Sequence, residues 1–260
     1  MNAILRYSLV ATFLCVVSVV FAQNDYPEYQ KDNDTYGCLP FINLSDMPDL
    51  IQCMPAPPAW DSPEISYDMQ RYVWGKRVRS EDPSRLAVVI ADSEWDDLEK
   101  VYANFKDAFG LKVTKEDTPI IYELLTRSLR TTDPTRRAVK AHYKRTRPFV
   151  YAGDPTATGE DAGLSDEGGY PSGHTLRGWV IMLVMTQVAP ERAAHLYQRA
   201  MDYSYSRVIA GCHWESDVDN TRWIASLLYS VLQTSDEYQK MVKSARQEYR
   251  KAAIPHLLPE

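Results

Sequence analysis

The sequence has few cysteines and histidines, few strand-forming segments and no internal repeat. Its four cysteines and five histidines do not show the spacing of a standard zinc site. Apart from the N-terminus, no apolar run is long enough to cross a bilayer, which argues against a membrane-embedded bundle. Positively charged residues are fewer than negatively charged ones: the sequence has 29 Lys and Arg and 35 Asp and Glu, which gives a net charge of −6. This balance argues against general affinity for nucleic acid polymers or anionic membranes.

The first 22 residues have the pattern of an export signal. One positive charge, Arg6, precedes an almost wholly apolar run from Leu9 to Val20, and the small residue Ala22 comes just before a polar stretch. This arrangement is typical of a signal peptide that is cleaved after Ala22. It predicts a periplasmic or secreted protein with no membrane insertion after cleavage. An uncleaved anchor helix is the alternative, because the run is only slightly shorter than a bilayer span.

Residues 23–63 are rich in Pro, Asp and Asn and predict an irregular N-terminal arm. In an oxidising compartment Cys38 and Cys53 could close a short loop within this arm. Cys212 would then remain as a buried thiol beside His213.

Residues 64–260 predict one all-α domain, a helical bundle, because apolar residues recur at helical spacing and strand signals are scarce. We expect a 19-residue loop at 151–169, and loops of that length in compact domains are often functional. Helices are predicted at 84–109, 119–129, 133–144, from Ser172 or Thr175 to 188, and at 191–209, 214–232 and 235–251.

Three short segments carry residues suited to phosphoryl transfer. His213 and Asp217 are four residues apart, so on a helical turn the carboxylate can bind Nδ1–H and leave Nε2 free as a nucleophile. Arg207 precedes them, and its guanidinium suits phosphate oxygens. Taken alone, each of these residues is more typical of a surface pair or a structural ion pair.

Ser172, Gly173 and His174 form the second segment, which predicts a turn at the start of a helix. Backbone amides at such a start bind anions, and the Ser172 hydroxyl adds a donor. His174 is placed to act as a general acid for the leaving alcohol. An ordinary helix cap is the alternative for this segment by itself.

The third segment contains Lys140 and Arg147, seven residues apart, followed by Pro148. This spacing predicts that the two cations align on one helical face, with the proline ending the helix. The neighbouring basic residues are more typical of a solvated stripe.

The three segments in this order resemble the signature of the phosphatidic acid phosphatase type 2 and vanadium haloperoxidase superfamily. That signature is Lys-x6-Arg-Pro, then Pro-Ser-Gly-His, then Ser-Arg-x5-His-x3-Asp, and every defining position matches here. Within the superfamily the chain resembles the secreted bacterial class A non-specific acid phosphatases, loosely from residue 60 to 250.

The resemblance implies an acid phosphatase that hydrolyses a broad range of small phosphomonoesters through a phosphohistidine on His213. Asp217 would orient that histidine, and His174 would protonate the leaving group and then activate water. The implied phosphate-binding residues are Lys140, Arg147, Ser172, Gly173 and Arg207. No metal or other cofactor is implied, since three cations can take the place of magnesium. Transfer of phosphate to alcohols is an expected side activity, and a homodimer is compatible with helical-bundle relatives.

Other functions fit parts of the pattern. A vanadium-dependent haloperoxidase would use the same pocket, but such enzymes are typically much longer. A soluble lipid-phosphate phosphatase and an exported phosphate-binding protein without activity are further alternatives. A zinc site from Cys212, His213, His174 and Asp217 is poor, because adjacent Cys and His do not readily coordinate one ion.

Overall fold

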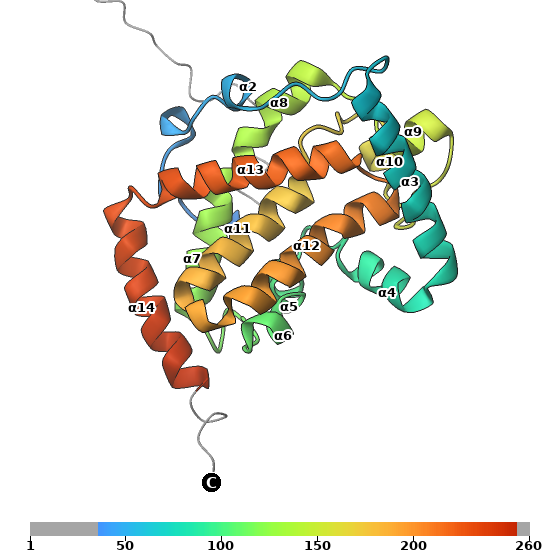
Figure 1. The fold of residues 1–260 in the computed structure, drawn as a ribbon. Helices are drawn as coiled ribbons and strands as arrows, with labels where there is room; N and C mark the ends of the chain where they lie inside the picture. Colours follow the sequence, from blue (N-terminus) through green and yellow to red (C-terminus); the bar gives the residue numbers. More distant parts are fainter. Residues whose placement is uncertain (1–35, 254–260) are drawn as a thin grey trace, which may run out of the picture.

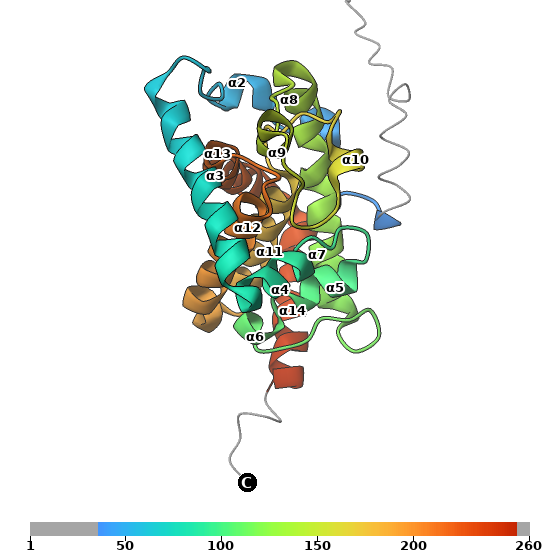
Figure 2. The same cartoon turned by 90° about the vertical axis from the view of Figure 1, so that its right-hand side faces the viewer.

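The structure is a computed structural model that describes residues 36–253, and within this range every regular element is helical. The all-α prediction is therefore confirmed (Figures 1 and 2). The predicted signal peptide lies outside the described residues, as do the first part of the predicted arm and the last seven residues. No helix in the described range is long and apolar enough to cross a membrane.

The helices have the following bounds: η1 Leu44–Asp46, α2 Leu50–Cys53, α3 Pro63–Glu81, α4 Pro83–Ala91, α5 Leu98–Ala103, α6 Lys106–Phe109, α7 Pro119–Thr132, η2 Asp133–Thr135, α8 Arg136–Tyr143, α9 Pro148–Ala152, α10 Asp161–Leu164, α11 Gly173–Val188, η3 Pro190–Arg192, α12 Ala193–Ala210, α13 Glu215–Leu232 and α14 Asp236–Ala253.

Helix α11 is the centre of the core, and α7, α12, α13 and α14 pack around it (Figure 1). Its sequence is apolar on almost every side, as expected for a helix surrounded by others. Ser172 caps the helix by accepting a hydrogen bond from the Thr175 amide, and Pro190 follows its end. Because the site segments border α8, α11, α12 and α13, this packing brings distant parts of the sequence together.

The prediction of a single helix at 84–109 is wrong, because three short helices, α4, α5 and α6, occupy that range. Between α4 and α5 the interruption comes from acidic side chains that bind backbone amides. The Glu94 carboxylate accepts hydrogen bonds from the amides of Trp95, Asp96 and Asp97. Asp97 then caps α5. This turn projects Trp95 toward the interior, where its ring lies against His174.

Lys140 and Arg147 do not share a helix, contrary to the prediction. Helix α8 ends at Tyr143, and Lys144 follows in the left-handed conformation with φ of 43°. Pro148 is the first residue of α9 rather than the end of α8, and Arg147 is the extended residue before it. A proline at a first helical position loses no hydrogen bond there. The two cations therefore reach the site from two separate elements.

The described part of the arm is tied to the core, although it is irregular. The Tyr170 hydroxyl donates to the Pro55 carbonyl at 2.6 Å, and Trp60 stacks on Tyr151 with ring centroids 5.0 Å apart. Cys38 and Cys53 are free thiols here rather than a disulfide, with Cys38 half-buried and Cys53 exposed.

Close packing between α11 and α12 depends on Gly178, since a Cβ at that position would clash with the ring of Tyr203. We expect Gly178→Ala to lower the free energy of unfolding by about 1 to 3 kcal/mol through overpacking. Urea unfolding followed by circular dichroism measures this change. Gly163→Ala is the matched control, because its new methyl group meets nothing within 4 Å. Equal stability of both variants would show that α11 and α12 can separate without cost.

Candidate active site

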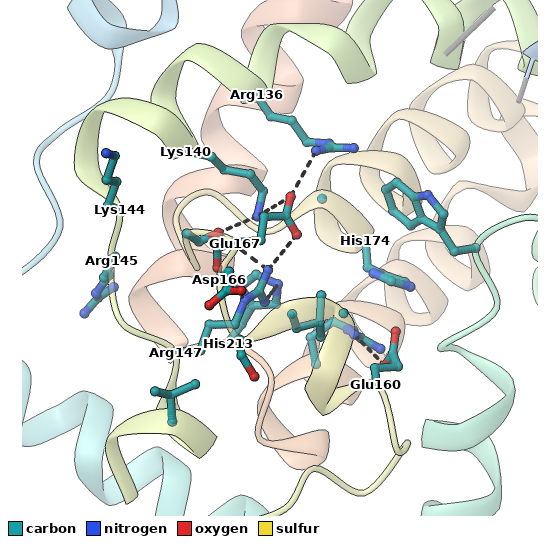
Figure 3. Close-up of a pocket in the computed structure, with 18 of the residues that line it drawn as sticks. Arg136, Lys140, Lys144, Arg145, Arg147, Glu160, Asp166, Glu167, His174 and His213 are labelled. Carbon is teal, nitrogen blue, oxygen red and sulfur yellow. Dashed lines mark hydrogen bonds and ion pairs between the residues drawn. The ribbon is translucent and has the colours of Figure 1, made fainter. Parts of the chain in front are cut away.

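The three predicted segments meet around one cavity of about 930 Å³ (Figure 3). Six of the eight predicted site residues line it: Lys140, Arg147, Gly173, His174, Arg207 and His213. The other two, Ser172 and Asp217, lie behind this wall and are fully buried. Cys212 is buried next to His213, as predicted from the sequence.

Ser172 serves mainly to hold the turn at the start of α11. Its Oγ accepts from the amide and the hydroxyl of Thr175, and its own amide donates to Thr221 Oγ1 at 3.0 Å. Gly173 is the residue of this turn that lines the cavity. A Cβ there would come within 3.2 Å of both Trp95 and Arg136, so glycine lets the backbone approach the cavity.

His213 presents one ring nitrogen to the cavity cations and the other to Asp217. Its Nδ1 lies 3.4 Å from Asp217 Oδ2, longer than an ordinary hydrogen bond. Its Nε2 lies 3.0 Å from Arg147 Nη1. A guanidinium can only donate, so this contact requires a lone pair on Nε2 and places the proton on Nδ1. This tautomer, with the proton on Nδ1 and a lone pair on Nε2, is the one that a nucleophilic Nε2 needs.

A chain of buried charges fixes the carboxylate of Asp217. Asp217 Oδ1 accepts from Arg145 Nη1 at 2.5 Å, and Oδ2 accepts from the Trp214 amide. Arg145 also donates to the buried carboxylate of Asp68 on α3, which in turn accepts from the amide and hydroxyl of Ser216. Asp68 is not among the predicted site residues, and Arg145 is one of the basic residues that are expected to form a solvated stripe. No local pattern marks Asp68, because its partners lie far along the chain.

His174 is held by the turn that interrupts the predicted 84–109 helix. Its Nε2 lies 3.1 Å from the Ser93 carbonyl oxygen, which can only accept, so Nε2 carries a proton. The ring packs on Trp95 at a centroid distance of 4.7 Å. Nδ1 is therefore the ring atom left for proton transfer to a substrate.

The three predicted phosphate cations are buried and anchored to the backbone or to acidic side chains. Lys140 Nζ donates to the Gly168 carbonyl at 2.6 Å, and Arg147 donates to the carbonyls of Glu167 and Cys212. Arg207 Nη2 donates to the Glu160 carboxylate at 2.9 Å. These anchors hold the positive groups around the cavity in fixed positions.

Two carboxylates from the predicted 151–169 loop enter this cation cluster, and neither is among the predicted site residues. Glu167 Oε1 lies 3.4 Å from Lys140 Nζ, and Oε2 lies 3.1 Å from Arg147 Nη2. Glu160 pairs with Arg207 in the same way. Figure 3 shows both acidic side chains directed toward the basic residues. Their oxygens mark positions at which the cluster accepts anionic groups.

Burial and neighbouring cations shift the ionisation of the site. Burial, followed by Arg147 and Lys140, lowers the pKa of His213 well below its ordinary value. Burial and Arg207 do the same to the pKa of His174. Burial and Arg147 lower the pKa of Lys140 to about 7. In this cavity, both histidines are neutral over a wider pH range than they are in water.

Within residues 36–253 no group of three or more His, Cys, Asp or Glu side chains is arranged to hold a metal ion. That range includes the four residues considered above for zinc. Of the histidines outside the motifs, His142 and His195 are exposed, and His256 lies outside the described residues.

Comparison with known proteins gives the family. A model of the PAP2 superfamily matches residues 124–235, which include all eight predicted site residues. A non-specific acid phosphatase from Providencia stuartii is 34% identical, over 85% of this chain and 89% of the relative. A non-specific acid phosphatase from Salmonella typhi is 34% identical over 75% of this chain and 78% of the relative. An acid phosphatase from Zymomonas mobilis is 31% identical over 78% of this chain and 76% of the relative.

The chain therefore belongs to the PAP2 superfamily. Within that superfamily it belongs with the acid phosphatases, which confirms the family predicted from the three motifs.

Anion binding should depend on the charge of Lys140. Its pKa of about 7 lies below the value of a free lysine, so the ammonium is present below that pH and is lost above it. Sulfate is a suitable probe because its own charge is constant over the range. We expect the sulfate dissociation constant of the wild-type protein to rise between pH 6 and 8.5, by up to about tenfold per unit above pH 7. Titration calorimetry measures it.

Lys140→Arg is the control for this titration, since a guanidinium keeps its charge throughout the range. The variant should bind sulfate with little dependence on pH. A wild-type affinity that is constant from pH 6 to 8.5 would show that Lys140 does not contribute its charge to the site.

Proposed function

We propose that this protein is an exported, metal-independent acid phosphatase that hydrolyses small phosphomonoesters through a phosphohistidine on His213. The observation that carries the proposal is the convergence of His213 Nε2 with Lys140, Arg147 and Arg207 on one cavity. Phosphoryl transfer depends chiefly on in-line positioning and on stabilising charge on the equatorial oxygens. The three cations supply that charge, and phosphate oxygens would displace Glu160 and Glu167 from them.

In the first half-reaction, Nε2 of His213 attacks phosphorus while the bond to the alcohol oxygen breaks. The electron pair of that bond goes to the alcohol oxygen, which takes a proton from Nδ1 of His174. The Nδ1–H of His213 faces Asp217, so the carboxylate stabilises the positive charge that develops on the ring. The products are the free alcohol and a phosphohistidine.

In the second half-reaction, His174 takes a proton from water as the water oxygen attacks phosphorus. The bond between phosphorus and Nε2 then breaks, which restores His213 and releases inorganic phosphate. An alcohol in place of water would give phosphate transfer, the expected side activity. The Ser93 carbonyl keeps the His174 ring in one orientation through both steps.

Export is proposed from the N-terminal sequence, with cleavage after Ala22 and a periplasmic or secreted product. The mass of the protein recovered from the periplasm or the medium tests this boundary. A recovered protein that begins at Met1 would exclude cleavage after Ala22.

The first test of the activity is hydrolysis of p-nitrophenyl phosphate near pH 6, with and without EDTA. We expect full activity in EDTA, because the proposed chemistry uses only side chains. His213→Ala should lose at least about 10³-fold in kcat, since removing the nucleophile of such a unit leaves only residual catalysis. His195→Ala is the control, because that histidine is exposed and lies outside the cavity. Loss of wild-type activity in EDTA would overturn the metal-independent scheme.

The dependence of rate on pH tests the roles of the two histidines. His174 must be protonated and His213 neutral for the first half-reaction, so kcat/KM should follow a bell-shaped profile. Burial lowers the pKa of His174, which places its loss of the required proton in the acid range and predicts an acid optimum. His174→Ala should abolish the alkaline limb of the profile along with most of the activity. A rate that rises steadily into alkaline pH would contradict the assignment.

A further inference from the structure

Arg136 lies on the wall of the cavity beside the predicted phosphate cations, although none of the three motifs includes it. It precedes Lys140 by four residues on α8, so the two side chains share one helical face. Its side chain is only 10% exposed. Figure 3 shows its guanidinium directed toward Glu167, above the Lys140 ammonium.

A buried carboxylate holds Arg136 in this position. Arg136 Nε donates to Asp133 Oδ1 at 2.8 Å. The other oxygen of Asp133 accepts from the Tyr36 hydroxyl at 2.8 Å and from Arg177 Nη2 at 3.2 Å. Asp133 is held in place by these contacts, so its hydrogen bond to Nε also holds the Arg136 guanidinium in place. Its Nη1 then faces the cavity.

Glu167 shows which cations a single anionic oxygen can reach at this point. Its Oε1 lies 3.4 Å from Lys140 Nζ and 3.7 Å from Arg136 Nη1. Its Oε2 contacts Arg147. One carboxylate is therefore shared between two predicted phosphate ligands and Arg136. Anionic groups of a substrate that replace Glu167 would meet the same three cations.

The cavity is far larger than one phosphate group requires. Its volume of about 930 Å³ is in the range of sites for whole small molecules. Trp95 forms part of its wall, with Arg177 stacked on the ring and the Arg136 guanidinium 5.2 Å from the ring centroid. The wall next to the phosphate cations thus combines the apolar ring of Trp95 with the guanidinium groups of Arg136 and Arg177.

We propose that Arg136 binds a second anionic group of the substrate, next to the phosphate that is transferred. This inference rests on the proposed phosphatase function. It assigns the site to phosphomonoesters whose alcohol carries its own negative group, such as phosphorylated hydroxy acids and sugar bisphosphates. A guanidinium suits this role because its planar fork matches a carboxylate or a phosphate.

The test compares two substrates that differ in one charge, 3-phosphoglycerate and glycerol 3-phosphate. The first has a carboxylate where the second has a hydroxymethyl group. We expect the wild-type protein to have the higher kcat/KM for 3-phosphoglycerate. Arg136→Gln should lower kcat/KM for 3-phosphoglycerate about tenfold more than for glycerol 3-phosphate, the scale of one charge-assisted hydrogen bond.

Two further variants control for charge and for folding. Arg77→Gln removes a positive charge from an exposed position on α3 outside the cavity, and it should leave the preference unchanged. Arg136→Lys keeps the charge but loses the fork, so it should reduce the preference several-fold less than the glutamine variant. If Arg136→Gln does not fold, the lysine variant carries the comparison, and an unchanged preference in it would then overturn the proposal.

The inference and the proposed function can fail separately. An equal loss for both substrates in Arg136→Gln, or no wild-type preference, would overturn the role of Arg136 while phosphatase activity stands. If the wild-type protein hydrolyses neither these esters nor p-nitrophenyl phosphate, the proposed function fails. Calorimetric binding of the same two esters to wild type and Arg136→Gln then decides the role of Arg136: tighter binding of 3-phosphoglycerate that depends on Arg136 supports it, and equal binding overturns it.

Discussion

Positive charge buried around one cavity is the constraint on which the rest of this structure depends. Lys140, Arg147 and Arg207 are almost wholly removed from water, which is costly unless other groups replace the lost hydration. Backbone carbonyls of Glu167, Gly168 and Cys212 replace part of the lost hydration by accepting hydrogen bonds. The carboxylates of Glu160 and Glu167 supply countercharge. The lowered pKa of Lys140 shows that the compensation is incomplete. The same deficit of negative charge is the physical basis of the affinity for an anion that we propose for this site.

The orientation of His213, the proposed nucleophile, follows from a second set of buried charges. Asp217 stands in the first turn of α13, where the helix dipole favours a carboxylate. Arg145 links it to Asp68 on α3, so the orientation of the His213 ring depends on a helix that contributes nothing to the cavity wall. The paired groups of Asp217, Arg145 and Asp68 form a rigid network, because each of them would be costly to leave unpaired. It keeps Nε2 directed at the cations.

The differences between expectation and structure have local physical causes. The periodicity at 84–109 is real, since Val89, Val101, Tyr102 and Phe105 are all buried. However, the carboxylates of Glu94 and Asp97 bind backbone amides in the turn between the end of α4 at Ala91 and the start of α5 at Leu98. The spacing of Lys140 and Arg147 similarly fits one helix, yet Lys144 adopts the left-handed conformation and Pro148 starts a new helix. In both places a turn stabilised by a few groups outweighs helical propensity.

The sequence by itself determined the helical class of the domain and pointed to eight candidate site residues, because helical periodicity and short motifs are local properties of the chain. Tertiary structure alone decided the rest. Packing of α3 against α13, and contacts of the 151–169 segment with basic residues of α8 and α12, placed Asp68, Arg136, Glu160 and Glu167 at the site. Asp68, Glu160 and Glu167 contact partners that are remote in sequence, and Arg136, although it is held by the nearby Asp133, meets the remote Glu167. Neither composition nor spacing can specify such contacts, because they form only when the helices pack and water is removed from between them.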